Sequence, residues 1–135
     1  MDVANQTAES AQRENLRWVI GQGHSPLQSV AAVLASRYKL ALIWELARGP
    51  KRFKELERAL APVTAKTLTR NLRDLERLTL VIRRKLDGRA LGVEYRLSPV
   101  GVALRPHILS LCHWAWDHRE AFAPGARDAA DSLQR

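Results

Sequence analysis

Cysteine is almost absent from the chain, because Cys112 is the only one among 135 residues. A disulfide within one chain is therefore excluded, and so is a zinc site built from a cluster of cysteines. Long apolar runs are also missing, since no stretch approaches the roughly 18 uncharged apolar residues of a membrane span. Residues 1–10 lack the basic start and apolar run of a secretory signal. We therefore expect a cytoplasmic protein.

Catalytic signatures are missing as well. The sequence has neither a phosphate-binding glycine loop nor a G-x-S-x-G motif. Its histidines are His24, His107, His113 and His118, and none pairs with another at the i+3 or i+4 spacing of a helical metal site. We expect no enzymatic activity and no cofactor. Surface histidines are the plain interpretation, and a metal sensor using Cys112, His113 and His118 across a dimer is the alternative.

What the chain does have is an ordinary globular composition, with 46% hydrophobic and 27% charged residues. Its length corresponds to one domain. We expect a disordered tail over residues 1–10, a single domain over residues 11–122 and a mobile tail over residues 123–135.

Positive charge is concentrated in the middle of the sequence. The net charge is +8, and the segment from Arg48 to Arg96 contains fourteen basic and six acidic residues. The two flanking segments each sum to zero, so the whole excess lies in this central segment. A concentrated excess of this kind is typical of a surface that binds a polyanion, although a solvated basic face is the alternative.

Apolar spacing and capping residues predict six helices. Ser25 and Thr64 are good N-cap residues, and Gly49-Pro50 is typical of a helix end. The expected helices are residues 14–20, a segment from Pro26, residues 37–48, residues 53–60, residues 64–78 and a segment from Pro99.

A hairpin is expected between the last two helices. The helical period of the apolar residues ends before residue 81. Residues 81–86 are β-branched at their start and basic after, Asp87-Gly88 is a turn signal, and Val93, Tyr95 and Leu97 alternate with polar residues. Two helices separated by a tight break and followed by a hairpin predict a winged helix-turn-helix fold, mostly α with a small β-hairpin wing. The expected core residues are Trp44, Phe53, Leu56, Leu68, Leu72 and Tyr95.

Several segments resemble the HxlR family of bacterial winged-helix regulators. The family reads I-L-x-E-L and G-x-x-R-F-x-E-L over the stretch that contains residues 43–46 (Ile-Trp-Glu-Leu) and 49–56 (Gly-Pro-Lys-Arg-Phe-Lys-Glu-Leu). Its V-E-Y-x-L-T-x-x-G pattern matches residues 93–97 and Gly101. The resemblance extends from about Ser25 to Trp114.

The resemblance implies a homodimeric DNA-binding transcriptional regulator whose N-terminal and C-terminal helices form the dimer interface. Both segments are charge-neutral and contain tryptophans, which suit partly buried contacts. The expected interface residues are Leu16, Trp18, Val19, Ile20, Leu104, Ile108, Leu111, Trp114 and Ala115.

Two departures from the family pattern matter. Family members often have Cys-Pro before the second helix and some sense oxidants there, whereas this chain has Ser25-Pro26. A serine hydroxyl forms no disulfide, so the resemblance does not extend to that redox switch. Thr79 replaces the glycine that ends the recognition helix. Because a β-branched residue disfavours positive φ, we expect that helix to end differently.

Base reading and phosphate binding are assigned to different side chains. Lys66 and Arg70 are the candidates for guanine edges in the major groove. The remaining candidates are Thr64, Thr67 and Thr69 for phosphate or thymine methyl groups, Lys51, Arg52 and Lys54 for phosphates, Arg84, Lys85 and Arg89 for the minor groove, and Arg73 on the outer helix face.

Structural alternatives stay open for several of these residues. Thr64 is equally suited to cap a helix, Arg52 to pair with an acidic neighbour, and Arg73 to offset Glu55 or Glu76. The wing is a solvated hairpin in the simplest interpretation.

The favoured function is therefore a homodimeric regulator that binds a roughly palindromic operator in double-stranded DNA. One alternative is a non-specific nucleic-acid-binding protein, and another is an adaptor whose basic face meets an acidic protein. A small-molecule effector is possible, and the sequence does not identify it.

Overall fold

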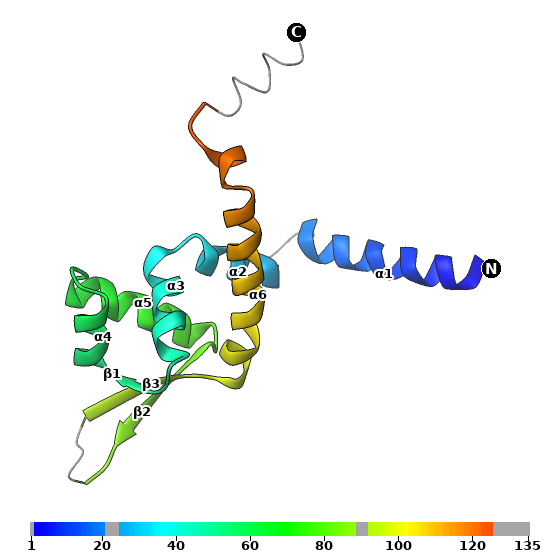
Figure 1. The fold of residues 1–135 in the computed structure, drawn as a ribbon. Helices are drawn as coiled ribbons and strands as arrows, with labels where there is room; N and C mark the ends of the chain where they lie inside the picture. The colour runs from blue at the N-terminus through cyan, green and yellow to red at the C-terminus, as the bar shows by residue number, and fades with distance from the viewer. Residues whose placement is uncertain (1, 21–24, 89–91, 126–135) are drawn as a thin grey trace.

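The computed structural model describes residues 2–20, 25–88 and 92–125, with side chains in residues 3–13 of the first range and throughout the other two. Figure 1 shows the arrangement of the elements. They are α1 (Asp2–Ile20), α2 (Pro26–Leu34), α3 (Arg37–Leu46), β1 (Lys51–Arg52), α4 (Phe53–Ala59), α5 (Ala65–Arg77), β2 (Val81–Leu86), β3 (Gly92–Leu97), α6 (Pro99–Asp117) and the 3₁₀ helix η1 (Arg119–Phe122).

The predicted order of helices and hairpin is confirmed, and one boundary is corrected. Residues 1–10 were expected to be a disordered tail, but α1 begins at Asp2. Small and polar residues with good helix propensity, such as Ala4, Gln6, Ala8 and Glu9, let the helix continue upstream of its apolar end. The expected tail over residues 123–135 lies largely outside the described residues.

Serine and threonine caps fix where four helices begin. Ser25, Ser36, Thr64 and Ser98 each precede a helix, and each side-chain oxygen accepts a hydrogen bond from a backbone N–H of the first turn. Ser25 also forms a capping box with Gln28. Such caps satisfy N–H groups that have no partner inside the helix, and each contributes about 1 kcal/mol.

The hairpin belongs to a three-stranded antiparallel sheet of order β1-β3-β2. Val81 pairs with Leu97 and Arg84 with Glu94 across the hairpin. The third strand, β1, pairs Lys51 with Tyr95 and was not expected from the sequence, because two residues give no alternation to detect. It ties the start of α4 to the wing.

Aliphatic side chains of α2, α3, α4, α5, β2 and α6 form the core, supplemented by the loops around α5. The buried members are Val33, Leu42, Ile43, Leu46, Leu56, Leu60, Val63, Leu68, Leu72, Leu75, Leu80, Val81 and Ile108. Phe53 and Tyr95 pack against this core as partly buried residues.

Trp44 is a wrong core prediction, because its side chain is 44% exposed. Leu42, Ile43 and Leu46 take the buried face of α3 instead. Trp44 lies on the flank of that face, where the guanidinium carbon of Arg105 is 5.2 Å from its ring centroid. A cation over an aromatic face is favourable, so the ring is partly covered by α6 rather than by the core.

The end of α5 corrects a third expectation. Thr79 adopts a φ of +59°, so the helix ends in the left-handed conformation that a glycine would favour. The N–H of Leu80 donates to the carbonyl of Leu75 at 3.0 Å, and the N–H of Thr79 donates to that of Glu76 at 2.9 Å. This is the Schellman pattern, and its two bonds offset the backbone strain of a β-branched residue.

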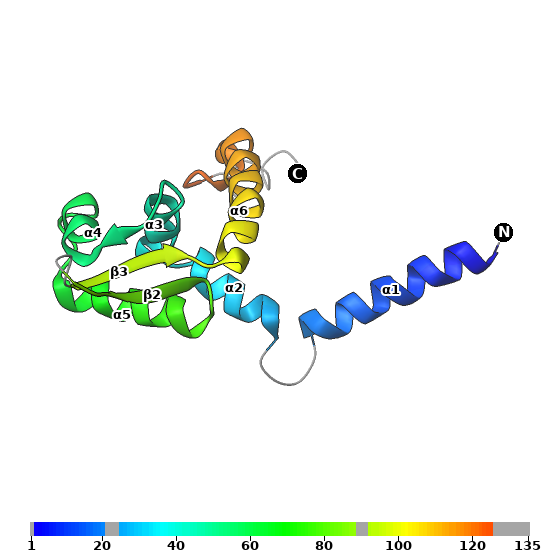
Figure 2. The same ribbon diagram turned by 90° about the horizontal axis from the view of Figure 1, so that it is seen from below.

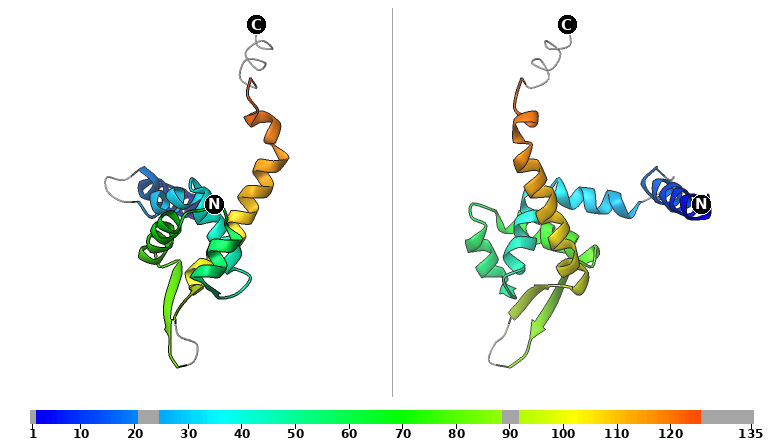
Figure 3. Two further views of the ribbon diagram at one scale, coloured as in Figure 1. Left: turned by 90° about the vertical axis from the view of Figure 1, so that its left-hand side faces the viewer. Right: turned by 45° about the vertical axis from the view of Figure 1, so that its right-hand side comes forward.

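Helix α1 and the C-terminal part of α6 project from the body formed by the other elements. Figure 2 shows α1 extending away from the sheet and from α3, α4 and α5. The views in Figure 3 show the C-terminal part of α6 and η1 extending on another side. None of the helices in the described ranges combines the length and hydropathy needed to cross a lipid bilayer.

Candidate nucleic-acid interface

One face of α5 presents basic and hydroxyl side chains to solvent. Lys66, Thr69, Arg70 and Arg73 follow the i, i+3, i+4, i+7 spacing of one helix face, opposite the buried leucines Leu68, Leu72 and Leu75. The three basic residues are exposed. They line a shallow hollow of about 460 Å³ together with Ala65, Thr69, Asp74 and Arg77.

Thr64 and Thr67 lie at the N-terminus of this helix, Thr64 as its N-cap and Thr67 in its first turn. The Thr64 side chain accepts a hydrogen bond from the N–H of Thr67 at 3.1 Å, and the two hydroxyls lie 3.0 Å apart. The capping interpretation of Thr64 is therefore confirmed. The threonine hydroxyls are held at the N-terminal end of α5, where the helix dipole favours an anion such as phosphate.

A second hollow joins the helix to the wing. It has a volume of about 430 Å³ and is lined by Phe53, Thr69, Arg73, Glu76, Arg83 and Tyr95. Arg73 from α5 and Arg83 from β2 therefore face one space. In the described part of the chain, Arg73 forms no ion pair with Glu55 or Glu76, so the proposed offset by those residues is not observed.

The basic residues before and in α4 have different surroundings. Lys51 is half-buried in β1, and the backbone N–H of Arg52 donates to Glu55 Oε1 at 3.2 Å. The Arg52 guanidinium lies beside Gly92 of the wing. Lys54 is exposed and its Nζ lies 3.3 Å from Glu57 Oε1, which partly neutralises it. Arg52 and Lys54 thus also serve local structure.

The wing carries exposed cations along β2. Arg84 and Lys85 are exposed, with Arg84 opposite Glu94 and Lys85 opposite Val93. Arg89 lies outside the described residues.

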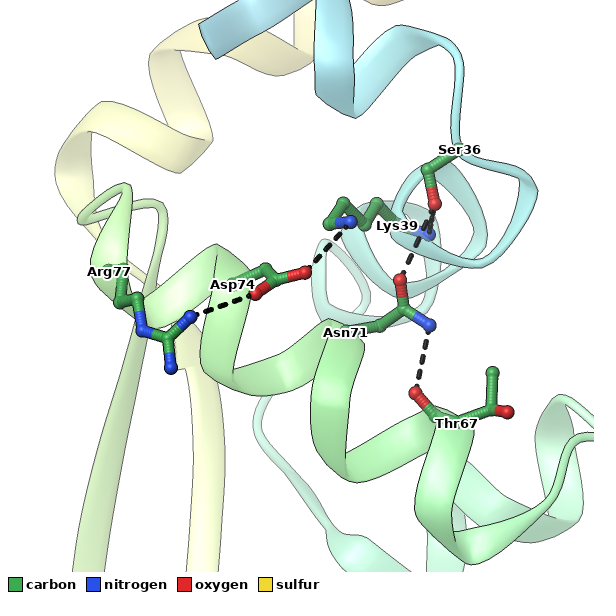
Figure 4. A network of polar contacts seen from close by, with 6 residues as sticks. All are labelled: Ser36, Lys39, Thr67, Asn71, Asp74 and Arg77. Carbon is green, nitrogen blue, oxygen red and sulfur yellow. Dashed lines mark hydrogen bonds and ion pairs between the residues drawn. The ribbon is translucent and has the colours of Figure 1, made fainter.

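A polar network that the sequence did not reveal attaches α5 to the start of α3 (Figure 4). Asn71 is buried, its Nδ2 donates to the carbonyl of Thr67 at 2.8 Å, and its Oδ1 accepts from Ser36 Oγ at 3.4 Å. Lys39 Nζ lies 3.1 Å from Asp74 Oδ2, and Arg77 Nη1 lies 3.3 Å from Asp74 Oδ1. The Asn71–Thr67 and Asp74–Arg77 contacts lie within α5 at helical spacing. The Ser36–Asn71 and Lys39–Asp74 contacts join α3 to α5 across a long separation in the chain, so they had no signal in the sequence.

The residues expected at a dimer interface divide into three groups. Ile108 is only 5% exposed within the single chain, and Leu104 packs against the same core, so these two support α6 from inside the protomer. Leu111, Trp114 and Ala115 are exposed. The side chains of Leu16, Trp18, Val19 and Ile20 lie outside the described residues, and only their place in α1 is known.

The end of α6 carries an aromatic cluster. The rings of Trp114 and His118 stack with centroids 4.6 Å apart, and Phe122 lies 5.8 Å from Trp114. His118 Nδ1 is 2.8 Å from the carbonyl oxygen of Trp114. Cys112 is a free, exposed thiol. Among the side chains that the structure describes, no three His, Cys, Asp or Glu residues gather as metal ligands would.

Comparison with known proteins shows to which family the chain belongs. The model of the HxlR-like helix-turn-helix family matches residues 33–122. The chain belongs to this family. Among curated HxlR-like relatives, the uncharacterised HTH-type transcriptional regulator YkvN of Bacillus subtilis is 34% identical over 88 residues, which are 65% of this chain and 75% of YkvN. The regulator YodB of the same organism is 32% identical over 89 residues, 66% of this chain and 80% of YodB.

Solved structures agree with this assignment. Reduced YodB from B. subtilis superposes with a TM-score of 0.65 at 28% identity, covering 76% of this chain and 96% of YodB. A chain from Enterococcus faecalis V583, described as a MarR-family regulator, gives a TM-score of 0.60 at 35% identity, covering 77% and 99% of the two chains. The predicted winged-helix fold is thereby confirmed, and this HxlR-like chain is related to transcriptional regulators.

Ser25 takes a structural role in this HxlR-like chain. Its side chain is buried, and its hydroxyl accepts a hydrogen bond from the N–H of Leu27 at 3.2 Å. The residue that replaces the cysteine of the family pattern is thus engaged as a helix cap.

Proposed function

We propose that this chain is a sequence-specific transcriptional regulator that binds double-stranded DNA as a homodimer, in the cytoplasm and on the nucleoid. The single observation that carries the proposal is the hollow shared by Arg73 of α5 and Arg83 of β2. Positively charged side chains from a helix and from a hairpin line this one hollow. A DNA backbone that lies between the recognition helix and the wing would contact both of them.

In this arrangement α5 enters the major groove. Lys66 and Arg70 reach base edges, where a guanidinium or ammonium group pairs with O6 and N7 of guanine. Thr64, Thr67 and Thr69 contact phosphate or thymine methyl groups at the helix entrance. Arg84, Lys85 and Arg89 of the wing flank the neighbouring minor groove, and Lys51, Arg52 and Lys54 bind phosphates.

The dimer is supported by apolar surface that a single chain leaves uncovered. Trp114 and Trp116, at the end of α6, are 54% and 67% exposed, and Phe122 of η1 is 63% exposed. The described side chains of α1, from Val3 to Arg13, are exposed too. Large exposed aromatic groups mark interaction surfaces, so we assign the end of α6 and η1 to the contact between protomers. We assign α1 to the same contact because it projects from the body of the single chain (Figure 2).

A competition gel-shift tests the proposal. A randomised duplex library is first enriched for sequences that the protein retains, and a labelled enriched duplex is then challenged with unlabelled mixed-sequence DNA. A sequence-specific dimer resists competition at equal mass, and its enriched sites are palindromic with half-sites about one helical turn apart. Competition at equal mass supports the non-specific alternative, and no binding at low salt supports the adaptor alternative.

An effector is part of the proposal as well. An apolar hollow of about 380 Å³ lies between α2, the end of α5 and the start of α6, and its lining includes Val30, Leu78, Thr79, Leu80 and Val100. A small apolar molecule bound there would touch the end of the recognition helix. A ligand-induced rise in Tm that is lost in Val100→Trp, which fills the hollow, tests this site.

A further inference from the structure

Among the described residues that line the hollow along α5, Asp74 is the one acidic residue. The other charged residues that line this hollow are Lys66, Arg70, Arg73 and Arg77. A carboxylate on a face proposed to meet phosphates opposes DNA binding unless its charge is offset. Its presence there therefore requires an explanation.

Two cations share the Asp74 carboxylate. Lys39 approaches one oxygen from α3 at 3.1 Å, and Arg77 approaches the other from the next turn of α5 at 3.3 Å (Figure 4). The Lys39 side chain is 16% exposed and that of Asp74 is 33% exposed, so this pair is better shielded from water than a surface ion pair. Arg77 is 76% exposed and lies at the rim of the same hollow.

In the described ranges, the cations nearer the start of α5 are not paired with a carboxylate, unlike Lys39 and Arg77. Among the residues that the structure describes, Lys66, Arg70 and Arg73 form no ion pair. A free cation that meets a phosphate releases a counterion from DNA, and each such contact steepens the dependence of log K on log salt by about 0.9. A cation already bound to a carboxylate contributes less.

We propose that Asp74 is a specificity-determining residue. By pairing with Arg77 and Lys39, its carboxylate keeps these two cations from binding DNA phosphates. It thereby lowers sequence-independent DNA affinity without weakening the base-reading end of α5. This inference rests on the proposed DNA-binding function. Non-specific affinity comes almost entirely from phosphate contacts, so retaining cations at one end of the helix raises the ratio of specific to non-specific binding.

Matched arginine substitutions test the proposal with little risk to the fold, because both side chains are exposed. Binding to a mixed-sequence duplex is measured by fluorescence anisotropy over a series of salt concentrations. Arg73→Gln is expected to reduce the salt slope by about one, and Arg77→Gln is expected to leave it nearly unchanged. Equal reductions by the two variants would overturn the proposal.

Removing the carboxylate gives the complementary result. Asp74→Asn is expected to raise affinity for the mixed-sequence duplex, to steepen the salt slope by about one and to lower the ratio of enriched-site to mixed-sequence affinity. Arg77→Gln added to Asp74→Asn returns the slope to the wild-type value. Glu120→Gln makes the same change in net charge in η1, far from α5 (Figure 1), and controls for overall charge.

The outcomes separate this inference from the function on which it rests. Wild-type protein that binds DNA, together with an Asp74→Asn variant that behaves like Glu120→Gln, overturns only the role of Asp74. An Asp74→Asn variant that binds both duplexes less well overturns it too, and shows that Asp74 acts by holding α5 against α3. Wild-type protein that binds no duplex overturns both proposals.

Discussion

Ser98 is hydrogen-bonded to Thr79, the residue with positive φ at the end of α5. The Ser98 hydroxyl donates to the Thr79 carbonyl and accepts from the N–H of Gly101 at 3.0 Å. The Ser98 N–H donates to the carbonyl of Leu80 at 3.0 Å. One serine thus caps α6 and fixes the turn that follows the recognition helix, so the position of α6 is coupled to that of α5.

Thr79→Gly is expected to stabilise the protein by about 1 kcal/mol. A β-branched residue in the left-handed region carries a strain of about 1–2 kcal/mol, and the greater entropy of glycine in the unfolded chain offsets part of the gain. Urea unfolding followed by far-UV circular dichroism measures the change. Thr79→Ala keeps a Cβ at the same φ and serves as the control, with little change expected. A glycine variant less stable than the wild type would contradict this account of the turn.

Gly101→Ala is expected to destabilise the fold by about 1–3 kcal/mol, the usual range for overpacking. A Cβ at position 101 would collide with the backbone carbonyl of Leu80, and it would also crowd Leu97. The backbone cannot move aside without disturbing the bonds of Ser98. Thermal unfolding measures the effect, and Ala103→Gly in the exposed part of α6 controls for helix propensity. An unchanged Tm for Gly101→Ala would show that α6 shifts freely.

Local signals in the sequence were sufficient for most of the fold. Ser25 and Thr64 were recognised as caps because capping depends on one side chain and the next three N–H groups. The wing was recognised because a segment with a β-branched start precedes the turn signal Asp87-Gly88 and apolar residues alternate with polar ones after it. The leucines of α5 were assigned to the core because their helical spacing is regular and the opposite face is polar.

The sequence predictions that were wrong or missing concern features that depend on residues distant in the chain but close in the fold. Trp44 directly follows the buried Ile43 in the apolar stripe predicted for α3. Only the packing of Arg105 of α6 on its ring shows that Trp44 lies at the edge of the core. The positive φ of Thr79 disagrees with the preference of its side chain, and the two Schellman bonds override that preference. They are donated by the N–H groups of Leu80 and Thr79 to the carbonyls of Leu75 and Glu76. The Lys39–Asp74 ion pair joins α3 to α5, so no regular spacing in the sequence predicts it.

Arg70→Ala is expected to weaken binding to the enriched duplex by about 1–3 kcal/mol while changing mixed-sequence binding much less. The guanidinium is exposed on the outer face of α5 and forms no ion pair among the described residues, so its removal leaves the fold intact. Anisotropy titrations with both duplexes measure the two affinities. An equal loss on both would show that Arg70 binds phosphate and does not read bases.

Arg84→Ala and Lys85→Ala are expected to weaken binding to all duplexes similarly and to reduce the salt slope by about one each. Their side chains extend from an exposed strand of the wing, where contact with the sugar-phosphate backbone is independent of sequence. Arg37→Ala, at the start of α3, removes the same charge outside the proposed DNA and protomer interfaces and is expected to leave the slope unchanged. Salt slopes that do not differ among the three variants would contradict a role for the wing.

Trp114→Ser is expected to shift the protein from dimer to monomer at concentrations where the wild type is dimeric. The indole is half-exposed in the single chain and stacks on His118 beside Phe122, so it offers a large preorganised apolar surface. Burial of such a side chain at an interface centre contributes about 2 kcal/mol or more, which corresponds to at least a tenfold weaker dimer when it is lost. Sedimentation equilibrium measures the dissociation constant. Trp44→Ser removes an indole of similar exposure between α3 and α6 and is expected to leave the association unchanged, so a weaker dimer in both variants would mean that loss of fold stability, and not loss of an interface, separates the protomers.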